Sequence, residues 1–268
     1  MNFSTPSLLS SIVAVCATLA APAASAQAFD AVRLYGAAPG KDGGRVGVAL
    51  LAGTEYPGSD ERRTLALPVL DYQWANGWFA GTTNGIGYNF SNSESMQYGL
   101  RLTADLGRKE SRSSALRGMG DVDTKAEFGG FFNYPLTPEF SLTSSLRYGA
   151  GQGGKGLVVD LGGAYSTQIA AQWRLGVGAG VSVANAEYMQ SFFGVTSAQA
   201  AASGYGAYAP AAGVRDGRVN FALTYMASPR VSVTAGVTAN TLLGDAENSP
   251  LVRQKTGVTG LLAATYAF

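Results

Sequence analysis

The stretch Met96-Gln-Tyr-Gly-Leu-Arg-Leu-Thr-Ala-Asp-Leu106 decides the fold class of this chain. Every second residue from Met96 to Leu106 is apolar, whereas Gln97, Arg101 and Asp105 fall on the opposite phase. Side chains of a β-strand alternate between its two faces, so the stretch predicts a strand with one apolar and one polar face. Its length also suits a tilted strand that crosses a membrane.

The same alternation recurs along most of the chain. It is clear in 126–134, 140–148, 157–166, 173–183, 218–225, 231–240 and 258–268, and weaker in 44–53, 64–74 and 77–90. The polar phase is rich in Ser, Thr and Gly and carries charged residues that we predict face a lumen: Arg101, Asp105, Lys125, Glu127, Arg147, Asp160, Arg174 and Arg218.

Aromatic residues stand at the ends of the apolar phase, next to short connections: Tyr134, Phe140, Tyr165, Trp173 and Tyr225. A soluble β-sandwich would also show alternation, but an aromatic girdle on the apolar face is typical of transmembrane barrels. We therefore expect an all-β fold, an antiparallel transmembrane β-barrel.

Composition agrees with a surface that is partly out of water. Charged residues make up 14% of the 268 residues, against about 25% in ordinary soluble domains. The formal net charge is +1, which argues against a nucleic-acid partner. After residue 26 no apolar run is long enough for a membrane helix, so strands must do the crossing.

The N-terminus has the features of an export signal. Residues 8–24 are apolar or small, and Ala24-Ser25-Ala26 has the form of a signal-peptidase site, which predicts a cleaved signal peptide over 1–26. No Lys or Arg precedes the apolar core, and a membrane anchor is the alternative. Cys16 is the only cysteine, so the mature chain would hold none. We expect 27–43 to be a periplasmic segment or the first strand, and 44–268 to form the barrel.

Connection lengths predict the orientation, because bacterial barrels have short periplasmic turns and longer external loops. Counting back from Phe268, short and long connections alternate, and all the short ones fall on the side of Phe268. The count gives eleven strands, whereas an even number is required. We favour twelve strands within a range of 10–12. The twelfth is either 31–37 or a split of 77–90 around Thr83-Asn84-Gly85, and only the second choice makes 54–63 external.

Several motifs are more specific than the barrel pattern. They are Glu187-Tyr-Met-Gln-Ser-Phe-Phe-Gly-Val-Thr-Ser-Ala-Gln-Ala-Ala-Ala-Ser-Gly204, Gly213-Val-Arg-Asp216, Leu242-Leu-Gly-Asp-Ala-Glu-Asn-Ser-Pro250, Glu55-Tyr-Pro-Gly-Ser-Asp60 and Tyr266-Ala-Phe268. In this order they resemble the MipA/OmpV family of outer-membrane proteins, from about Gly47 to the C-terminus. The family-motif residues that become interaction candidates are Tyr188, Met189, Phe193, Gly194, Val195, Ser203, Gly204, Gly244, Asp245, Ser249 and Pro250. Tyr205 stands where an apolar aliphatic residue is more usual.

Local chemistry explains part of these motifs. Thr196 and Gln199 have the spacing of a capping box, and Gly204 suits a left-handed helix end, so we expect a short helix over Ser197–Ser203. The apolar residues from Tyr188 to Val195 either fold the loop over the barrel mouth or form a contact patch for a partner. For 242–250 we expect a tight loop in which Asp245 and Asn248 bond backbone amides.

Catalysis has little support in the sequence. The chain has no His, which excludes Ser-His-Asp arrangements and metal sites with His ligands. The acidic pairs Asp121/Asp123 and Asp60/Glu61 lie in polar loops, where solvated turn residues are the simpler interpretation. We expect no enzyme activity, no metal and no cofactor.

The family resemblance implies a role and partners. It implies a scaffold in the outer membrane of a Gram-negative bacterium that links a lytic transglycosylase (MltA) to a bifunctional penicillin-binding peptidoglycan synthase. The expected surroundings are membrane lipid and lipopolysaccharide. Tyr266 and Phe268 resemble the C-terminal signal read by the barrel-assembly machinery. A narrow diffusion pore is the alternative, as is a surface barrel that acts in adhesion or stress response.

Overall fold

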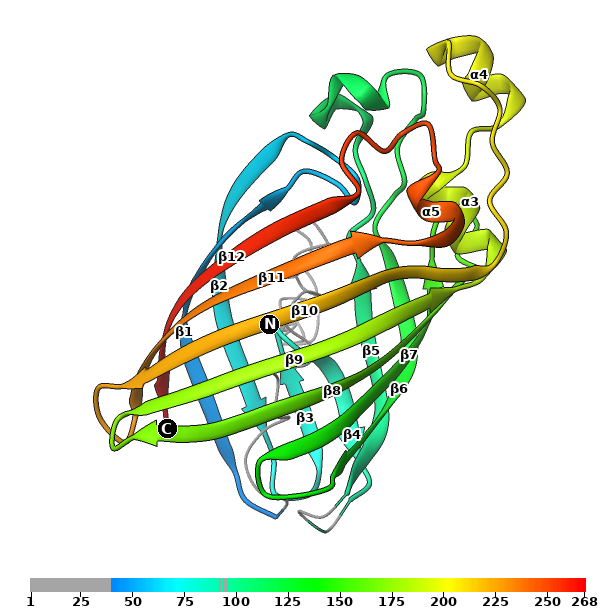
Figure 1. The fold of residues 1–268 in the computed structure, drawn as a ribbon. Coiled ribbons are helices and arrows are strands. Elements are labelled where there is room, and N and C mark those ends of the chain that lie inside the picture. Colours follow the sequence, from blue (N-terminus) through cyan, green and yellow to red (C-terminus); the bar gives the residue numbers. More distant parts are fainter. Residues whose placement is uncertain (1–39, 92, 94–95) are drawn as a thin grey trace, which may run out of the picture.

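The computed structural model describes residues 40–268 except 92, 94 and 95. Within them, twelve antiparallel strands close into one barrel, in which β1 pairs with β12. Figure 1 shows the strands tilted against the barrel axis, with the helices gathered at one end. The strands are β1 Gly43–Thr54, β2 Arg62–Gln73, β3 Trp78–Gly81, β4 Gly85–Asn89, β5 Gln97–Asp105, β6 Lys125–Pro135, β7 Phe140–Ala150, β8 Gly156–Ala170, β9 Trp173–Ala184, β10 Gly213–Met226, β11 Val231–Leu242 and β12 Thr256–Ala267. The predicted twelve-stranded barrel is confirmed.

The twelfth strand comes from the split of 77–90. β3 and β4 pair from Trp78↔Tyr88 to Gly81↔Gly85, around the turn at Thr83-Asn84-Gly85. The alternative strand 31–37 lies outside the described residues, as do the predicted signal peptide 1–26 and most of the segment 27–43, and the barrel closes without it. The 55–61 connection consequently lies at the same end as the other long loops, which is the external end.

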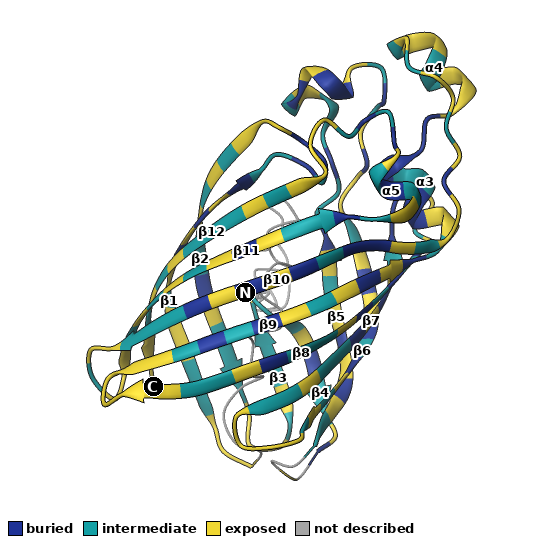
Figure 2. Ribbon diagram, in the orientation of Figure 1, coloured by how far each residue is buried: buried dark blue, intermediate teal, exposed yellow. Residues whose placement is uncertain are grey.

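The apolar phase faces outward and the polar phase faces inward. Along β6, Phe128 and Phe132 are exposed, whereas Glu127 and Phe131 are buried. Figure 2 shows this alternation as exposed and buried bands along the strands. Exposing so many apolar side chains to water would be unfavourable. The hydrocarbon core of a membrane accommodates such an outward apolar surface.

Outward aromatic residues gather near the short turns. Trp78, Tyr98, Tyr134, Tyr165, Trp173 and Tyr266 are all exposed and lie close to that end of their strands. Trp173 of β9 and Tyr225 of β10 are opposite each other, with ring centroids 4.9 Å apart. This belt is the interfacial girdle that the sequence predicted, at its periplasmic side.

The C-terminus closes the barrel. Phe268 and Gly44 exchange two backbone hydrogen bonds, each of 3.0 Å, at the foot of β1. The Phe268 ring stacks on Tyr72 at 6.2 Å between centroids. The last residue therefore joins the first strand to the last.

Three short helices lie in the long external loops: α3 Ala186–Phe193, α4 Ser197–Ser203 and α5 Gly244–Glu247. Two single-turn 3₁₀ segments, η1 Glu110–Arg112 and η2 Ser114–Leu116, lie in the loop between β5 and β6. The predicted Ser197–Ser203 helix is confirmed, but α3 was not anticipated as a helix. Of the residues that the structure describes, none forms a helix long and apolar enough to cross a membrane.

Candidate functional site

A buried ladder of charges runs along the inner wall from β5 to β10. Arg147 lies between two carboxylates, with its Nη1 3.4 Å from Glu127 Oε2 and its Nη2 2.8 Å from Asp160 Oδ2. Asp160 also accepts hydrogen bonds from Ser182 Oγ at 2.6 Å and from Arg218 Nη1 at 3.1 Å. Buried charges are tolerated when they are paired and hydrogen-bonded, and the ion pairs among Glu127, Arg147, Asp160 and Arg218 supply part of that compensation.

A β-bulge in β10 adds two more charges to the ladder. The register with β9 shifts between Val214 and Asp216, so Arg215 and Asp216 are both buried although they are consecutive. Arg215 Nε contacts the Asp216 carboxylate, and its Nη1 donates to the Tyr188 hydroxyl at 2.9 Å. The Gly213–Asp216 motif therefore marks a bulge that re-aims a side chain.

Six of the eight residues predicted to face the lumen are buried in this wall: Arg101, Asp105, Glu127, Arg147, Asp160 and Arg218. Lys125 is half-buried near the external end of β6, and Arg174 is exposed at the periplasmic end of β9. With Arg215 and Asp216 the buried inner wall carries four arginines and four carboxylates. The wall is therefore electrically balanced.

Helix α3 packs over the external mouth of the barrel. Tyr188, Met189, Phe192 and Phe193 on it are all buried, and they pack with Val122, Ala150, Val158, Ala184, Leu242 and Ala246 from the surrounding strands and loops. The stretch therefore folds over the barrel, as one of the two sequence interpretations held. Burial raises the pKa of the Tyr188 hydroxyl above its ordinary value.

Both ends of α3 are hydrogen-bonded to other segments, the start to β8 and the end to two loops. At its start the Asn185 side chain accepts from the backbone N–H of Tyr188 and of Leu157. At its end Arg108 Nη1 donates to the Phe192 carbonyl at 2.9 Å and Ser249 Oγ donates to the Phe193 carbonyl at 2.6 Å. Carbonyls that a helix end leaves without a partner are thus satisfied from two other loops. Burial lowers the pKa of the Arg108 guanidinium to about 10.

Two further family motifs, 55–60 and 242–250, meet near α3. The Tyr56 hydroxyl donates to the Leu251 carbonyl at 2.9 Å, and the Arg253 N–H donates to the Gly58 carbonyl at 2.7 Å. Burial raises the pKa of the Tyr56 hydroxyl above its ordinary value. We call this assembly of 55–60, α3, α4, Gly213–Asp216 and 242–253 the external cap.

The loop after β11 behaves partly as expected. Asp245 Oδ2 accepts from the Ala211 N–H at 2.7 Å, which is the predicted bond to a backbone amide. Asn248 instead donates its Nδ2 to the Gly244 carbonyl at 3.1 Å, so that half of the prediction is wrong. Gly244 has φ +54, a conformation that side chains disfavour, where the chain enters α5.

Helix α4 projects from the cap and is fastened by polar bonds. Thr196 and Gln199 form the predicted capping box, and Gly204 ends the helix at φ +80. Gln199 Nε2 reaches the Met119 carbonyl at 2.6 Å. The Tyr205 hydroxyl donates to the Ala115 carbonyl at 3.0 Å and accepts from Arg253 Nη2 at 2.6 Å, which gives this unusual residue a role.

The structure brings most motif residues into the cap. Met189, Phe193, Val195 and Ser249 are buried there together with Tyr188, and Gly194 follows α3. Ser203 lies on α4, where its hydroxyl donates to the Gln199 carbonyl. Gly244 and Asp245 lie in α5, and Pro250 follows Ser249.

Carboxylates of both acidic pairs contact side chains of the loop between β5 and β6. Lys109 Nζ lies 2.9 Å from Asp121 and 3.4 Å from Asp123, and Glu61 accepts from Ser113. In the described part of the chain no group of three or more His, Cys, Asp or Glu side chains could hold a metal ion.

Comparison with solved structures finds other barrels. The chain is similar to the NanC porin (TM-score 0.47, 11% identity, 82% of this chain and 98% of that chain) and to the KdgM porin (0.45, 10%, 83% and 99%). It is also similar to the outer membrane channel DcaP of Acinetobacter baumannii (0.39, 9%, 85% and 96%). Among curated proteins no sequence matches.

A closed antiparallel barrel with an even number of strands, an outward apolar surface and an aromatic girdle is the form of bacterial outer-membrane proteins. Residues 46–268 match the family described as "MltA-interacting protein MipA". That match covers most of the chain, including every motif of the external cap. The chain therefore belongs to the MipA family.

Proposed function

We propose that this barrel is a scaffold that holds murein-hydrolysing and murein-synthesising enzymes at the outer membrane through its periplasmic end. The family description names MltA as an interaction partner, and MltA is a lytic transglycosylase. A penicillin-binding peptidoglycan synthase is the second partner in this proposal. The barrel then supplies an anchor and a binding surface, and no chemical step of its own.

The observation that carries the proposal is the packing of α3 over the external mouth. Met189 and Phe193 of α3 are buried there, and Arg147 and Arg218 in the wall below form ion pairs with Asp160. We expect a barrel whose mouth is packed in this way to conduct ions poorly, because conduction needs a water-filled path with sites that ions can enter and leave. In this proposal the partner enzymes therefore bind at the periplasmic end.

The periplasmic surface consists of short turns and the strand ends beside them. Leu136, Glu139 and Arg230 are exposed there. Placement requires export through the signal peptide 1–26 and insertion among lipid and lipopolysaccharide. Tyr266 and Phe268, both exposed at the end of β12, suit recognition by the barrel-assembly machinery.

The test is capture of a purified MltA-type lytic transglycosylase by the immobilised full-length barrel in detergent micelles. The expected result is retention by the wild-type chain and loss with the triple variant Leu136→Ser/Glu139→Gln/Arg230→Gln. These positions leave Thr137 and Ser228 in place, whose hydroxyls bond the turn backbones. Equal retention by both chains, or no retention by either, would overturn the proposal.

A narrow pore is the second candidate. A cavity of about 450 Å³ at the periplasmic end, described below, favours it because the described residues leave this space within the barrel. Planar-bilayer recording separates the two functions. The scaffold proposal expects no discrete steps from the wild-type chain, and reproducible single-channel steps together with failed capture would replace it by the pore.

A further inference from the structure

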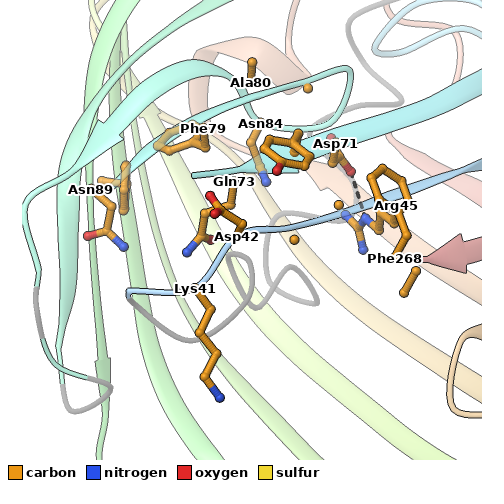
Figure 3. Close-up of a pocket in the computed structure, with 16 residues that line it drawn as sticks. Lys41, Asp42, Arg45, Asp71, Gln73, Phe79, Ala80, Asn84, Asn89 and Phe268 are labelled. Atoms are coloured by element: carbon orange, nitrogen blue, oxygen red, sulfur yellow. Dashed lines mark hydrogen bonds and ion pairs between the residues drawn. The ribbon is translucent and has the colours of Figure 1, made fainter. Parts of the chain in front are cut away.

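The periplasmic cavity is lined by residues from the first strands of the barrel, from β6 and from the C-terminus. Its walls come from the start of β1, the end of β2, β3, Asn89 of β4, Phe131 of β6 and the C-terminal Phe268. Its volume of about 450 Å³ lies in the range of small-molecule sites. Figure 3 shows Arg45, Asp71, Asn84 and Phe79 around it, with Lys41 at its edge.

One side of the cavity carries a braced guanidinium. Arg45 Nε donates to Asp71 Oδ2 at 2.8 Å, and the Thr83 hydroxyl donates to the other oxygen of Asp71 at 2.5 Å. Arg45 Nη2 lies 3.4 Å from the Thr83 hydroxyl. Nη1 makes no hydrogen bond to any described residue, and the Arg45 side chain is 45% exposed. A guanidinium fixed on one edge and open on another is suited to a carboxylate.

The other side carries neutral groups. The side-chain carbonyl Oδ1 of Asn84 is buried and has no hydrogen-bond partner among the described residues, which costs free energy unless a ligand or water donates to it. Phe79 and Phe131 pack edge to face at 5.9 Å and offer an apolar wall. An amide acceptor beside aromatic rings suits a sugar with an acetamido N–H or a hydroxyl group and an apolar C–H face.

We propose that this cavity binds a carboxylate-bearing N-acetylated amino sugar, as found in murein glycan whose stem peptides have been removed. Arg45 pairs with the carboxylate, and Lys41 adds a positive charge at the edge beside Asp42, whose Oδ1 accepts from the Ala75 N–H. Asn84 accepts a hydrogen bond from the sugar, and Phe79 covers its C–H face. The inference rests on the proposed function and deepens it, since the barrel would touch the substrate of the enzymes that it gathers.

The test is isothermal titration calorimetry, in which N-acetylmuramic acid is added to the full mature chain in detergent micelles. The detergent must lack a sugar headgroup, because a maltoside would compete. N-acetylglucosamine has the same ring without the carboxylate, lactate supplies the carboxylate alone, and N-acetylneuraminic acid is an acidic N-acetylated sugar from another source. We expect saturable binding of N-acetylmuramic acid and at least tenfold weaker binding of the other three.

Two variants assign the contacts. Arg45→Gln should weaken N-acetylmuramic acid about tenfold and leave N-acetylglucosamine unchanged, as expected for loss of one charge-assisted contact. Arg174→Gln is the matched control, since Arg174 lies at the same end of the barrel but outside the cavity, and it should change nothing. The exposed Lys41→Gln, which should weaken only the acid, keeps the test valid if Arg45→Gln fails to fold.

Absence of saturable binding would overturn the inference, as would equal effects of Arg45→Gln and Arg174→Gln. Tighter binding of N-acetylneuraminic acid than of N-acetylmuramic acid would overturn the assignment to murein. Capture of the transglycosylase without sugar binding would leave the scaffold standing and remove only this site.

Discussion

The two ends of the barrel are built in opposite ways. At the external end, bonds run between loops far apart in sequence, such as Tyr56 to Leu251 and Arg108 to Phe192. At the periplasmic end, the bonds lie within a turn, as when Thr137 accepts from the Phe140 N–H and Ser228 accepts from the Val231 N–H, or reach the adjacent strand, as from the Ser166 N–H to the Glu139 carbonyl. The external end should therefore respond cooperatively to substitution, whereas the periplasmic turns should change one at a time without unfolding the barrel.

The largest expected effect is at the ladder below the external cap. Asp160→Asn leaves Arg147 and Arg218 buried without their shared carboxylate, which should cost about 3–5 kcal/mol in the free energy of unfolding. Its periplasmic counterpart is Asp71→Asn, whose partner Arg45 is exposed, and it should cost at most about 1 kcal/mol. Urea unfolding in lipid vesicles measures the free energy of unfolding of both variants. Equal losses would contradict the difference between the two ends of the barrel.

A smaller loss is expected from the apolar face of α3. Phe193→Ala removes a buried ring from the closed mouth, which should cost about 3–4 kcal/mol. Leu136→Ala in a periplasmic turn, where the side chain is exposed, should leave stability unchanged. Limited proteolysis of the external loops provides a second readout, and unaltered cleavage in Phe193→Ala would show that α3 does not hold the cap.

Tyr56→Phe tests one bond between loops. Loss of its hydroxyl donor to Leu251 should cost about 1 kcal/mol below pH 10. Because burial raises the pKa of Tyr56 in the folded state, its contribution is complete below the ordinary value and is lost as the pH rises through the folded pKa. The stability difference between wild type and Tyr56→Phe should then shrink above pH 10. A constant difference would contradict the burial of this hydroxyl.

The smallest effect is expected at the outer rim. The Lys109 ammonium holds the pKa of the Asp121 carboxyl below its ordinary value, so the stabilising contact is present above that value and is lost as the pH falls through the lowered pKa. Lys109→Gln should return the Asp121 titration toward its ordinary range. Carboxyl ¹³C NMR in micelles measures this midpoint, and an unchanged midpoint would show that the ion pair does not form.

Features with a local cause could be predicted from the sequence. Period-2 alternation predicted the strands and six buried residues of the inward set, and Thr196, Gln199 and Gly204 predicted α4 with its capping box and end. The turn signal at Asn84-Gly85 supplied the twelfth strand as one of two choices. These signals need only neighbours along the chain.

Two missed features left traces in the sequence. Tyr188, Met189, Phe192 and Phe193 have the spacing of one helix face, which would have indicated α3. Arg215 and Asp216 put two charges in a row where the strand pattern allows only one to face inward, and that conflict indicates a bulge.

Contacts between loops left no such trace. Nothing in the sequence pairs Tyr56 with Leu251 or Ser249 with the end of α3, because these contacts depend on how the closed barrel positions its loops. The periplasmic cavity belongs to the same class, since Arg45, Asn84 and Phe131 come from three different strands or turns. Local rules cannot specify such sites.

One capture experiment compares the two ends directly. The immobilised barrel carries either the turn variant Leu136→Ser/Glu139→Gln/Arg230→Gln or the external variant Ala198→Lys/Ala201→Lys, which alters exposed residues of α4. Retention of the MltA-type transglycosylase should be lost with the first and unchanged with the second, while both variants keep the folded mobility of the wild type on a gel. Retention that survives the turn variant and disappears with the external one would contradict a periplasmic scaffold.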